Sequence, residues 1–235
     1  MPTEYHLAHF SDSQMAPNDS SSSLLLRDIA YQRIKDAIRM AELRPGQPLT
    51  ETGLSKMLGI SRTPVREALR ALAQEGLVQI IPGRAVTVAA PSFNEVMDAI
   101  HIRYLLEPEV VRLATKALTD EDIATLREAI KKMEVAVDSG DRATWSKIDD
   151  IFHETFSNAC PNQLLGDLSL QIRNRISYLA IDIESDDRRL AVCTSEHRVI
   201  VEKVAEKDAD GAKVAMEEHI RKLRDSIFRR YTHTY

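Results

Sequence analysis

The chain has 235 residues, of which 43% are hydrophobic and 29% charged, which excludes a mainly disordered or fibrous protein. No apolar run approaches the roughly 20 residues that cross a bilayer, and no N-terminal signal sequence is visible. The two cysteines, Cys160 and Cys193, form neither a disulfide framework nor a CxxC pair. We therefore expect a cytoplasmic protein with no membrane partner.

The net charge of −5 is unevenly distributed along the chain. Residues 1–23 are acidic and rich in serine, and we expect them to form a disordered leader. Residues 24–89 carry ten basic and six acidic side chains, whereas residues 90–235 carry 21 basic and 27 acidic ones. A small basic segment ahead of a larger acidic body is typical of a nucleic-acid-binding domain joined to a second domain.

The basic segment shows a pattern of three helices and a hairpin. Helical spacing of apolar residues predicts a first helix over about 25–41, and a second short helix ends at Gly59. A third helix begins near Ser61, and two β-rich runs around residues 77–88 predict a hairpin. This order, with a tight turn between the second and third helices, predicts a winged helix-turn-helix over residues 24–89.

The start of the third predicted helix is polar and basic. We expect its polar side chains to face outward, and they are Arg62, Thr63, Arg66 and Arg70. Arg62 and Arg66 are four residues apart on one helical face, where both can reach one groove of DNA. The alternative is a solvated helix start that carries surface arginines without a role in binding.

The rest of the chain, residues 90–235, is helical in pattern. Helices are predicted at about 93–118, 120–138, 142–159, 162–184, 187–207 and 208–231. No further strand-rich segment follows, so the fold is predicted to be mainly α, with a C-terminal all-helical antiparallel bundle and any site in its interior.

Four side chains of the bundle have the chemistry of metal ligands. Asp149 and His153 are four residues apart and lie on one helical face, while His197 and His219 belong to two later helices. Three imidazoles and one carboxylate that project into a bundle interior suit Zn²⁺, Ni²⁺ or Mn²⁺. Spacing by itself leaves open that these histidines are ordinary core or surface groups.

Both halves of the chain resemble known families. The run Ser61-Arg-Thr-Pro-Val-Arg-Glu-Ala-Leu-Arg70, within residues 49–78, closely resembles the GntR family of bacterial transcription regulators. The helical half resembles the FCD ligand-binding domain of the FadR subfamily. Its matching motifs are Arg103 with Leu106-Glu107, Asp149-x-x-Phe152-His153, Ala159-Cys-Pro-Asn162, Glu196-His197 and Met216-x-x-His219-Ile220.

The resemblance implies roles for the residues of both halves. In the DNA-binding half, Arg62 and Arg66 would enter the major groove, and Gly83, with Arg84 beside it, would form the wing tip in the minor groove. In the helical half, the resemblance implies that Asp149, His153, His197 and His219 bind a divalent metal at the floor of an effector pocket.

The effector implied by the resemblance is a small carboxylate. Arg103 is expected to hold its carboxylate bidentately, although a surface or interface salt bridge is the alternative. Arg173 and Asn162 are further candidates, and Asn162 alternatively caps the helix after Pro161.

The predicted function is a ligand-responsive transcription regulator, by default a repressor, that binds a palindromic double-stranded DNA operator as a homodimer. One alternative is a metalloenzyme whose three histidines and aspartate activate water, although the chain has no HExxH motif. The other alternative is a regulator in which the metal only stabilises the bundle.

Overall fold

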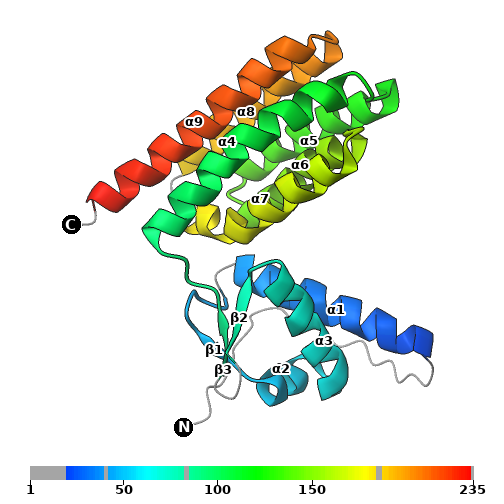
Figure 1. Ribbon diagram of the computed structural model, residues 1–235, viewed down its shortest axis with the longest axis vertical. Coiled ribbons are helices and arrows are strands. Elements are labelled where there is room, and N and C mark those ends of the chain that lie inside the picture. The colour runs from blue at the N-terminus through cyan, green and yellow to red at the C-terminus, as the bar shows by residue number, and fades with distance from the viewer. Residues whose placement is uncertain (1–19, 40–41, 82–84, 184–186, 234–235) are drawn as a thin grey trace. The chain divides into compact units, whose positions relative to one another are not determined.

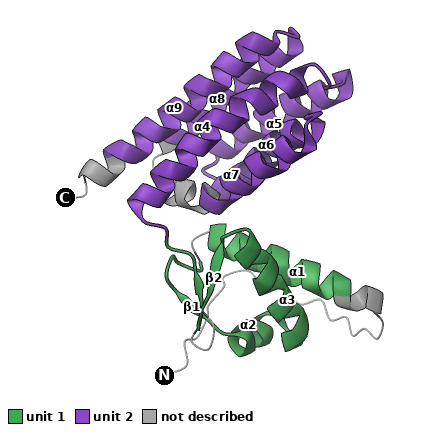
Figure 2. Cartoon of the chain, viewed as in Figure 1, with its two compact units in different colours: residues 1–90 green, residues 91–235 purple. Residues whose placement is uncertain are grey.

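The computed structural model divides into two compact units, residues Met1–Ala90 and Pro91–Tyr235 (Figures 1 and 2). The residues it describes are 20–39, 42–81, 85–183 and 187–233. Most of the expected leader, residues 1–19, lies outside these ranges. The predicted mainly α architecture, with a winged helix-turn-helix ahead of an all-helical unit, is confirmed.

The first unit combines three helices with a small sheet (Figure 1). Its elements are α1 (Ser20–Arg39), β1 (Pro48–Leu49), α2 (Glu51–Leu58), α3 (Arg62–Gln74), β2 (Val78–Ile81) and β3 (Ala85–Val88). The strands are antiparallel in the order β1-β3-β2, and the register pairs Gln79 with Thr87. Packing of α1 against α3 buries Ile34, Leu69 and Leu72.

The structure of this unit differs from the predicted elements in two places. Helix α1 begins at Ser20, so Ser20–Ser23 belong to it and not to a leader. Serine is well tolerated in the first turn of a helix, and a low apolar content therefore does not mark the helix start. The third strand, Pro48–Leu49, was not expected because a run of two residues carries no alternation of its own.

The turn between α2 and α3 depends on Gly59. Its φ of +68° lies in the left-handed region, which side chains with a Cβ adopt only with strain. The N–H of Gly59 bonds to the carbonyl of Ser55, which ends α2 and lets α3 begin after Ser61. This turn fixes the direction of α3 relative to α2.

The second unit is a bundle of long helices. They are α4 (Phe93–Thr115), α5 (Asp120–Asp138), α6 (Arg142–Ala159), α7 (Gln163–Ile183), α8 (Asp187–Ala205) and α9 (Ala209–His233). Their bounds lie within three residues of the predicted ones. Helix α4 packs against α9, α7 and α6, and α5 packs against α6 and α8 (Figure 1).

Reciprocal capping and a continuous apolar core hold this bundle together. Ser92 at α4 and Thr119 at α5 each form a capping box with the acidic residue three positions on. The core includes side chains that are at most 2% exposed, among them Phe152, Phe156, Leu126, Met133, Ile200 and Ile220. Phe152 and Phe156 lie on α6, so this core also backs the inward-facing residues of the candidate site.

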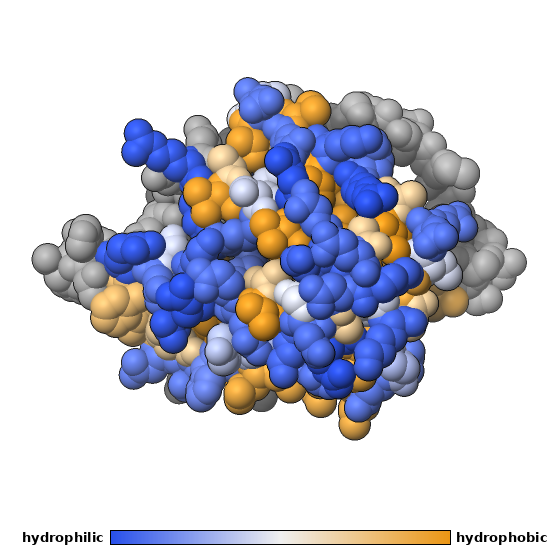
Figure 3. Space-filling model, turned by 90° about the horizontal axis from the view of Figure 1, so that it is seen from above, coloured by the Kyte–Doolittle hydropathy of each residue, from blue (hydrophilic) through white to orange (hydrophobic). Residues whose placement is uncertain are grey.

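Across the described residues, no helix combines the length and apolar character of a membrane span. On the face drawn in Figure 3, hydrophilic side chains dominate and hydrophobic ones lie scattered between them.

The contact between α6 and α7 depends on Gly166. A Cβ at this position would lie 2.5 Å from the carbonyl oxygen of Ser157, and backbone atoms cannot yield as a flexible side chain can. We expect Gly166→Ala to destabilise this unit by about 1–3 kcal/mol, despite the better helix propensity of alanine. Urea unfolding followed by tryptophan fluorescence measures the change. Asp167→Ala, at the exposed neighbouring position, is the control, and equal stability of both variants would contradict the steric argument.

Candidate functional site

Helix α3 separates a buried apolar face from an exposed basic one. Val65, Leu69 and Leu72 are at most 2% exposed and anchor the helix in the core of its unit. The predicted DNA-contacting residues on this helix, Arg62, Thr63, Arg66 and Arg70, are all exposed. The predicted wing residues Gly83 and Arg84 lie outside the described part of the chain.

The two leading arginines of α3 share one carboxylate partner. Glu51, the first residue of α2, accepts two hydrogen bonds from Arg66, at 2.8 Å from Nε and 3.0 Å from Nη2. Arg62 Nη2 lies 3.3 Å from the same carboxylate. The hydrogen bond from Arg66 lowers the pKa of Glu51, and the same bond raises the pKa of Arg66. Both guanidinium groups are therefore held side by side at the start of α3.

In the bundle, the four predicted metal ligands converge from three helices. Asp149 and His153 lie on α6, His197 on α8 and His219 on α9. One ring nitrogen from each of the three histidines lies within 4.8 Å of the others. Oδ1 of Asp149 lies 3.7 Å from both His153 Nε2 and His197 Nδ1. These separations suit ligands around one ion, because metal–nitrogen and metal–oxygen distances are about 2.0–2.2 Å.

The protonation of these side chains also suits a metal ion. Burial, followed by the positive charge of Arg173, lowers the pKa of His153 to about 4. Burial and the neighbouring His219 lower the pKa of His197 as well. Both rings are thus neutral near pH 7 and offer lone pairs. Nδ1 of His197 is fully buried without a hydrogen-bond partner, which a coordinated cation would supply.

Carboxylates behind two of the histidines orient their rings. Glu196 Oε2 lies 2.8 Å from Nδ1 of His219, and Glu107 Oε2 lies 3.3 Å from Nδ1 of His153. A proton on each Nδ1 directs the lone pair of Nε2 toward the other ligands, an arrangement that also makes the imidazole a stronger donor. His197 stacks on Phe152, with ring centroids 4.1 Å apart, so packing fixes the third ring.

Arg173 orients the aspartate. It donates to Oδ2 of Asp149, which leaves Oδ1 facing the histidines, and its Nη1 lies 2.8 Å from Asp150 Oδ1. Burial opposes ionisation of Asp149, but the charge of Arg173 together with the interactions with these three histidines outweighs it and holds the pKa of that carboxyl well below its usual range. The predicted effector residue Arg173 therefore also positions a predicted metal ligand.

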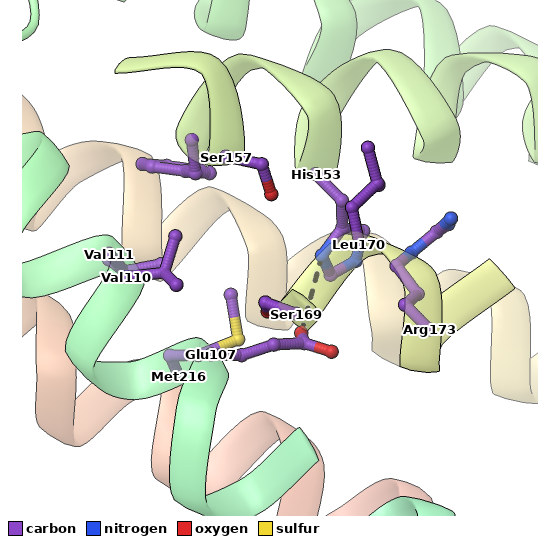
Figure 4. Close-up of a pocket in the computed structure, with 10 residues that line it drawn as sticks. Glu107, Val110, Val111, His153, Ser157, Ser169, Leu170, Arg173 and Met216 are labelled. Carbon is purple, nitrogen blue, oxygen red and sulfur yellow. Dashed lines mark ion pairs between the residues drawn. The ribbon is translucent and has the colours of Figure 1, made fainter. Parts of the chain in front are cut away.

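A small cavity adjoins His153 (Figure 4). Its volume is about 10 Å³, which holds about one water molecule. Glu107 from α4 faces His153 across it, and Arg173 from α7 lies at its edge (Figure 4). Val110 and Met216 contribute apolar walls. A larger guest would require these side chains to move apart.

The structure does not bring the other two effector candidates to this cavity. Arg103 is 4% exposed and pairs with Glu107 at 2.5 Å, so it lies behind that carboxylate. Asn162 is exposed, and its Oδ1 accepts from the N–H of Leu165, which is the alternative capping role considered from the sequence.

Each half of the chain matches a known protein family. Residues 26–88 match the family described as "Bacterial regulatory proteins, gntR family", and residues 98–222 match the FCD domain. The Nta operon transcriptional regulator of Aminobacter aminovorans is 31% identical over 186 residues, covering 78% of this chain and 86% of that protein. This chain belongs to the GntR family. It is a bacterial transcription regulator with an FCD effector-binding domain.

Other relatives of this GntR-family chain are also named as regulators. The HTH-type transcriptional repressor RspR of Escherichia coli K12 is 28% identical over 84% of this chain and 86% of its own length. The solved structure of E. coli McbR/YncC has a TM-score of 0.78 at 24% identity, covering 88% of this chain and 98% of that one. At that identity the likeness concerns the fold.

Several functional partners in this GntR-family chain were missed by sequence reasoning. Glu107 and Glu196 belong to the matching motifs, but the sequence assigns them no role, and in the structure they orient His153 and His219. Glu51 and Asp150 were not singled out at all. For two of these residues, the sequence does contain a signal, which is their position next to a predicted metal ligand: Glu196 directly precedes His197, and Asp150 directly follows Asp149. Cys193 lies one helical turn before His197 and close to its ring.

Proposed function

We propose that this protein represses its target genes as a homodimer, and that a small carboxylate bound at a divalent metal ion in the helical unit releases it from a palindromic operator. The observation that carries the proposal is that Asp149, His153, His197 and His219 lie close together in the bundle, and that Nδ1 of His197 is buried there without a hydrogen-bond partner. The repressor named RspR supports the sign of regulation by analogy only. As a regulator, the protein is expected to act in the cytoplasm and to catalyse no reaction.

The chain's own residues would divide the work of the effector site. A bound Zn²⁺, Ni²⁺ or Mn²⁺ would supply positive charge and an open coordination position for a carboxylate oxygen. Arg173 keeps Asp149 oriented toward the histidines. It also lines the cavity in which the effector would bind. Because the cavity has room for about one water molecule, effector entry must displace side chains on α4, α7 or α9. Such a displacement is what allows the effector to favour one state of the protein over another.

Self-association is supported by an apolar stripe on α4. Ile102 and Leu105 are 40% and 61% exposed and lie three residues apart on one helical face. A twofold dimer presents two α3 helices to the two halves of a palindrome. Sedimentation at several protein concentrations tests the dimer directly, and a monomer at micromolar concentration would contradict it.

The operator is tested by incubating the purified protein with sheared genomic DNA of its source at moderate salt and sequencing the retained fragments. We expect a few palindromic sites, and binding that weakens steeply with salt because phosphate contacts release counterions. Diffuse recovery of the genome would contradict specific operator recognition.

The metal and effector are tested by titrating short mono- and dicarboxylic acids into metal-loaded and chelator-treated protein. We expect binding of an acid that disappears on chelation while the fold persists. If chelation lowers the melting temperature and leaves acid binding unchanged, the metal is purely structural. Steady turnover of a bound acid would instead support the metalloenzyme.

The contact of Glu51 with both arginines predicts an effect on DNA selectivity. Glu51→Gln removes a negative charge beside Arg62 and Arg66, so we expect affinity for non-operator duplex to rise by about two- to fivefold. The ratio of operator to non-operator affinity should fall, because the arginines lose the partner that holds them together. Fluorescence anisotropy with both duplexes measures it. Glu42→Gln, the same charge change at an exposed loop residue, is the control, and an equal rise there would show a mere net-charge effect.

A further inference from the structure

Cys193 lies against the predicted metal ligands. It precedes His197 by one turn of α8, and its Sγ lies 3.9 Å from Nε2 of that ring. Cys193 is a core residue and is only 3% exposed. Packing therefore directs the thiol to the ligand side of α8 and away from solvent.

Two independent groupings place the sulfur within reach of a shared ion. Ligand atoms of Asp149, Cys193 and His197 all lie within 4.8 Å of one another, and so do those of Cys193, Glu196 and His219. A sulfur and a nitrogen or oxygen on opposite sides of one ion are separated by up to about 4.5 Å. The sulfur contacts Nε2 of His197, whereas Nδ1 of that ring faces Asp149, so sharing one ion requires the thiol or the ring to turn.

The surroundings favour a ligand role for this thiol. Nδ1 of His197 is buried without a hydrogen-bond partner and lies 3.7 Å from Oδ1 of Asp149, so the polar atoms here are separated by a distance that an ion would bridge. Cys160, the other cysteine, is equally buried at the end of α6 but belongs to no candidate ligand cluster in the described residues. The chain thus contains a matched internal control.

We propose that Cys193 coordinates the metal ion as a thiolate, beside Asp149, His153, His197 and His219. On coordination the S–H bond breaks, the sulfur donates its electron pair to the ion, and the proton leaves to the solvent. This inference rests on the metal site of the proposed function. With Cys193 as a fifth protein ligand, a carboxylate effector would supply a further oxygen ligand. A soft sulfur ligand also shifts preference toward Zn²⁺ and Co²⁺ and away from Mn²⁺.

The decisive experiment uses Co²⁺ as a spectroscopic probe in the full-length protein. We expect visible d–d bands together with a near-ultraviolet sulfur-to-cobalt charge-transfer band in the wild type. Cys193→Ser should keep the d–d bands and lose the charge-transfer band, whereas Cys160→Ser should keep both.

Each other outcome overturns a defined statement. Wild-type d–d bands without charge transfer would leave the metal site intact and show that Cys193 merely contacts His197. Absence of all cobalt bands would overturn the metal site together with this inference. A charge-transfer band that survives in Cys193→Ser and disappears in Cys160→Ser would assign the sulfur to Cys160.

A second measurement uses metal affinity and needs no chromophoric metal. Competition with a chromophoric chelator should show that Cys193→Ser weakens Zn²⁺ binding by at least about tenfold, the loss typical even for outer-shell partners. Mn²⁺ binding should change less, because Mn²⁺ prefers oxygen ligands. An equal loss for both ions in a variant with unchanged circular dichroism would contradict thiolate coordination.

Discussion

Replacing Arg173 by methionine is expected to destabilise the helical unit of the metal-free protein by about 3–5 kcal/mol. Arg173 bonds to both Asp149 and Asp150, whose side chains are only 17% and 13% exposed. Methionine fills similar volume but removes the cation that the two neighbouring carboxylates share in a poorly solvated place. An uncompensated buried charge costs far more than the ion pair itself contributes.

The measurement is urea unfolding of chelator-treated protein, followed through Trp145. This is the single tryptophan of the chain, it is 4% exposed on α6, and it therefore reports on the helical unit. Arg175→Met, at an exposed position of the same helix, is the matched control and should change stability by less than about 0.5 kcal/mol.

A second variant separates charge from packing. Arg173→Met combined with Asp149→Asn and Asp150→Asn removes both carboxylate charges that Arg173 contacts, so it should recover much of the loss. A combined variant as unstable as Arg173→Met would show that the arginine acts through packing. Comparisons at one protein concentration keep any contribution of self-association constant.

The fold could be predicted closely because the residues that begin or end helices agree with the spacing of apolar residues along most of this chain. Thr119 starts a helix with a capping box, Gly59 ends one in the left-handed region, and Pro161 separates two. The two exceptions have no local signal in the sequence. The short strand Pro48–Leu49 exists because β3 offers it a partner, and Ser20 extends α1 although its surroundings in the sequence are polar.

The candidate site was less completely predictable. The spacing of Asp149 and His153 reveals a shared face, but only packing shows that α8 and α9 bring His197 and His219 to it. Arg103 has the right chemistry for a carboxylate effector, yet its own helix supplies Glu107 four residues later. Intrachain pairing of this kind is invisible to a motif, which names residue types without their partners.

Arg66→Ala is expected to weaken operator binding by about 5- to 150-fold per half-site, the range for loss of one bidentate base contact. Its guanidinium forms a two-bond contact with the Glu51 carboxylate, so the free protein holds this group in one orientation at the start of α3. Because a dimer would place two such residues on one palindrome, the losses compound. Anisotropy titrations with operator and non-operator duplexes measure both affinity and selectivity.

Two further variants distinguish base reading from simple charge. Arg66→Lys keeps the positive charge but cannot form a bidentate contact, so non-operator binding should persist while operator preference falls. Arg221→Ala removes an arginine of similar exposure, 50% against 46%, from α9 of the helical unit, and it should leave DNA binding unchanged. Operator affinity of Arg66→Ala equal to wild type would exclude α3 as the reading helix. A loss that is identical on both duplexes would instead assign Arg66 to the phosphate backbone, where it positions the protein without selecting a sequence.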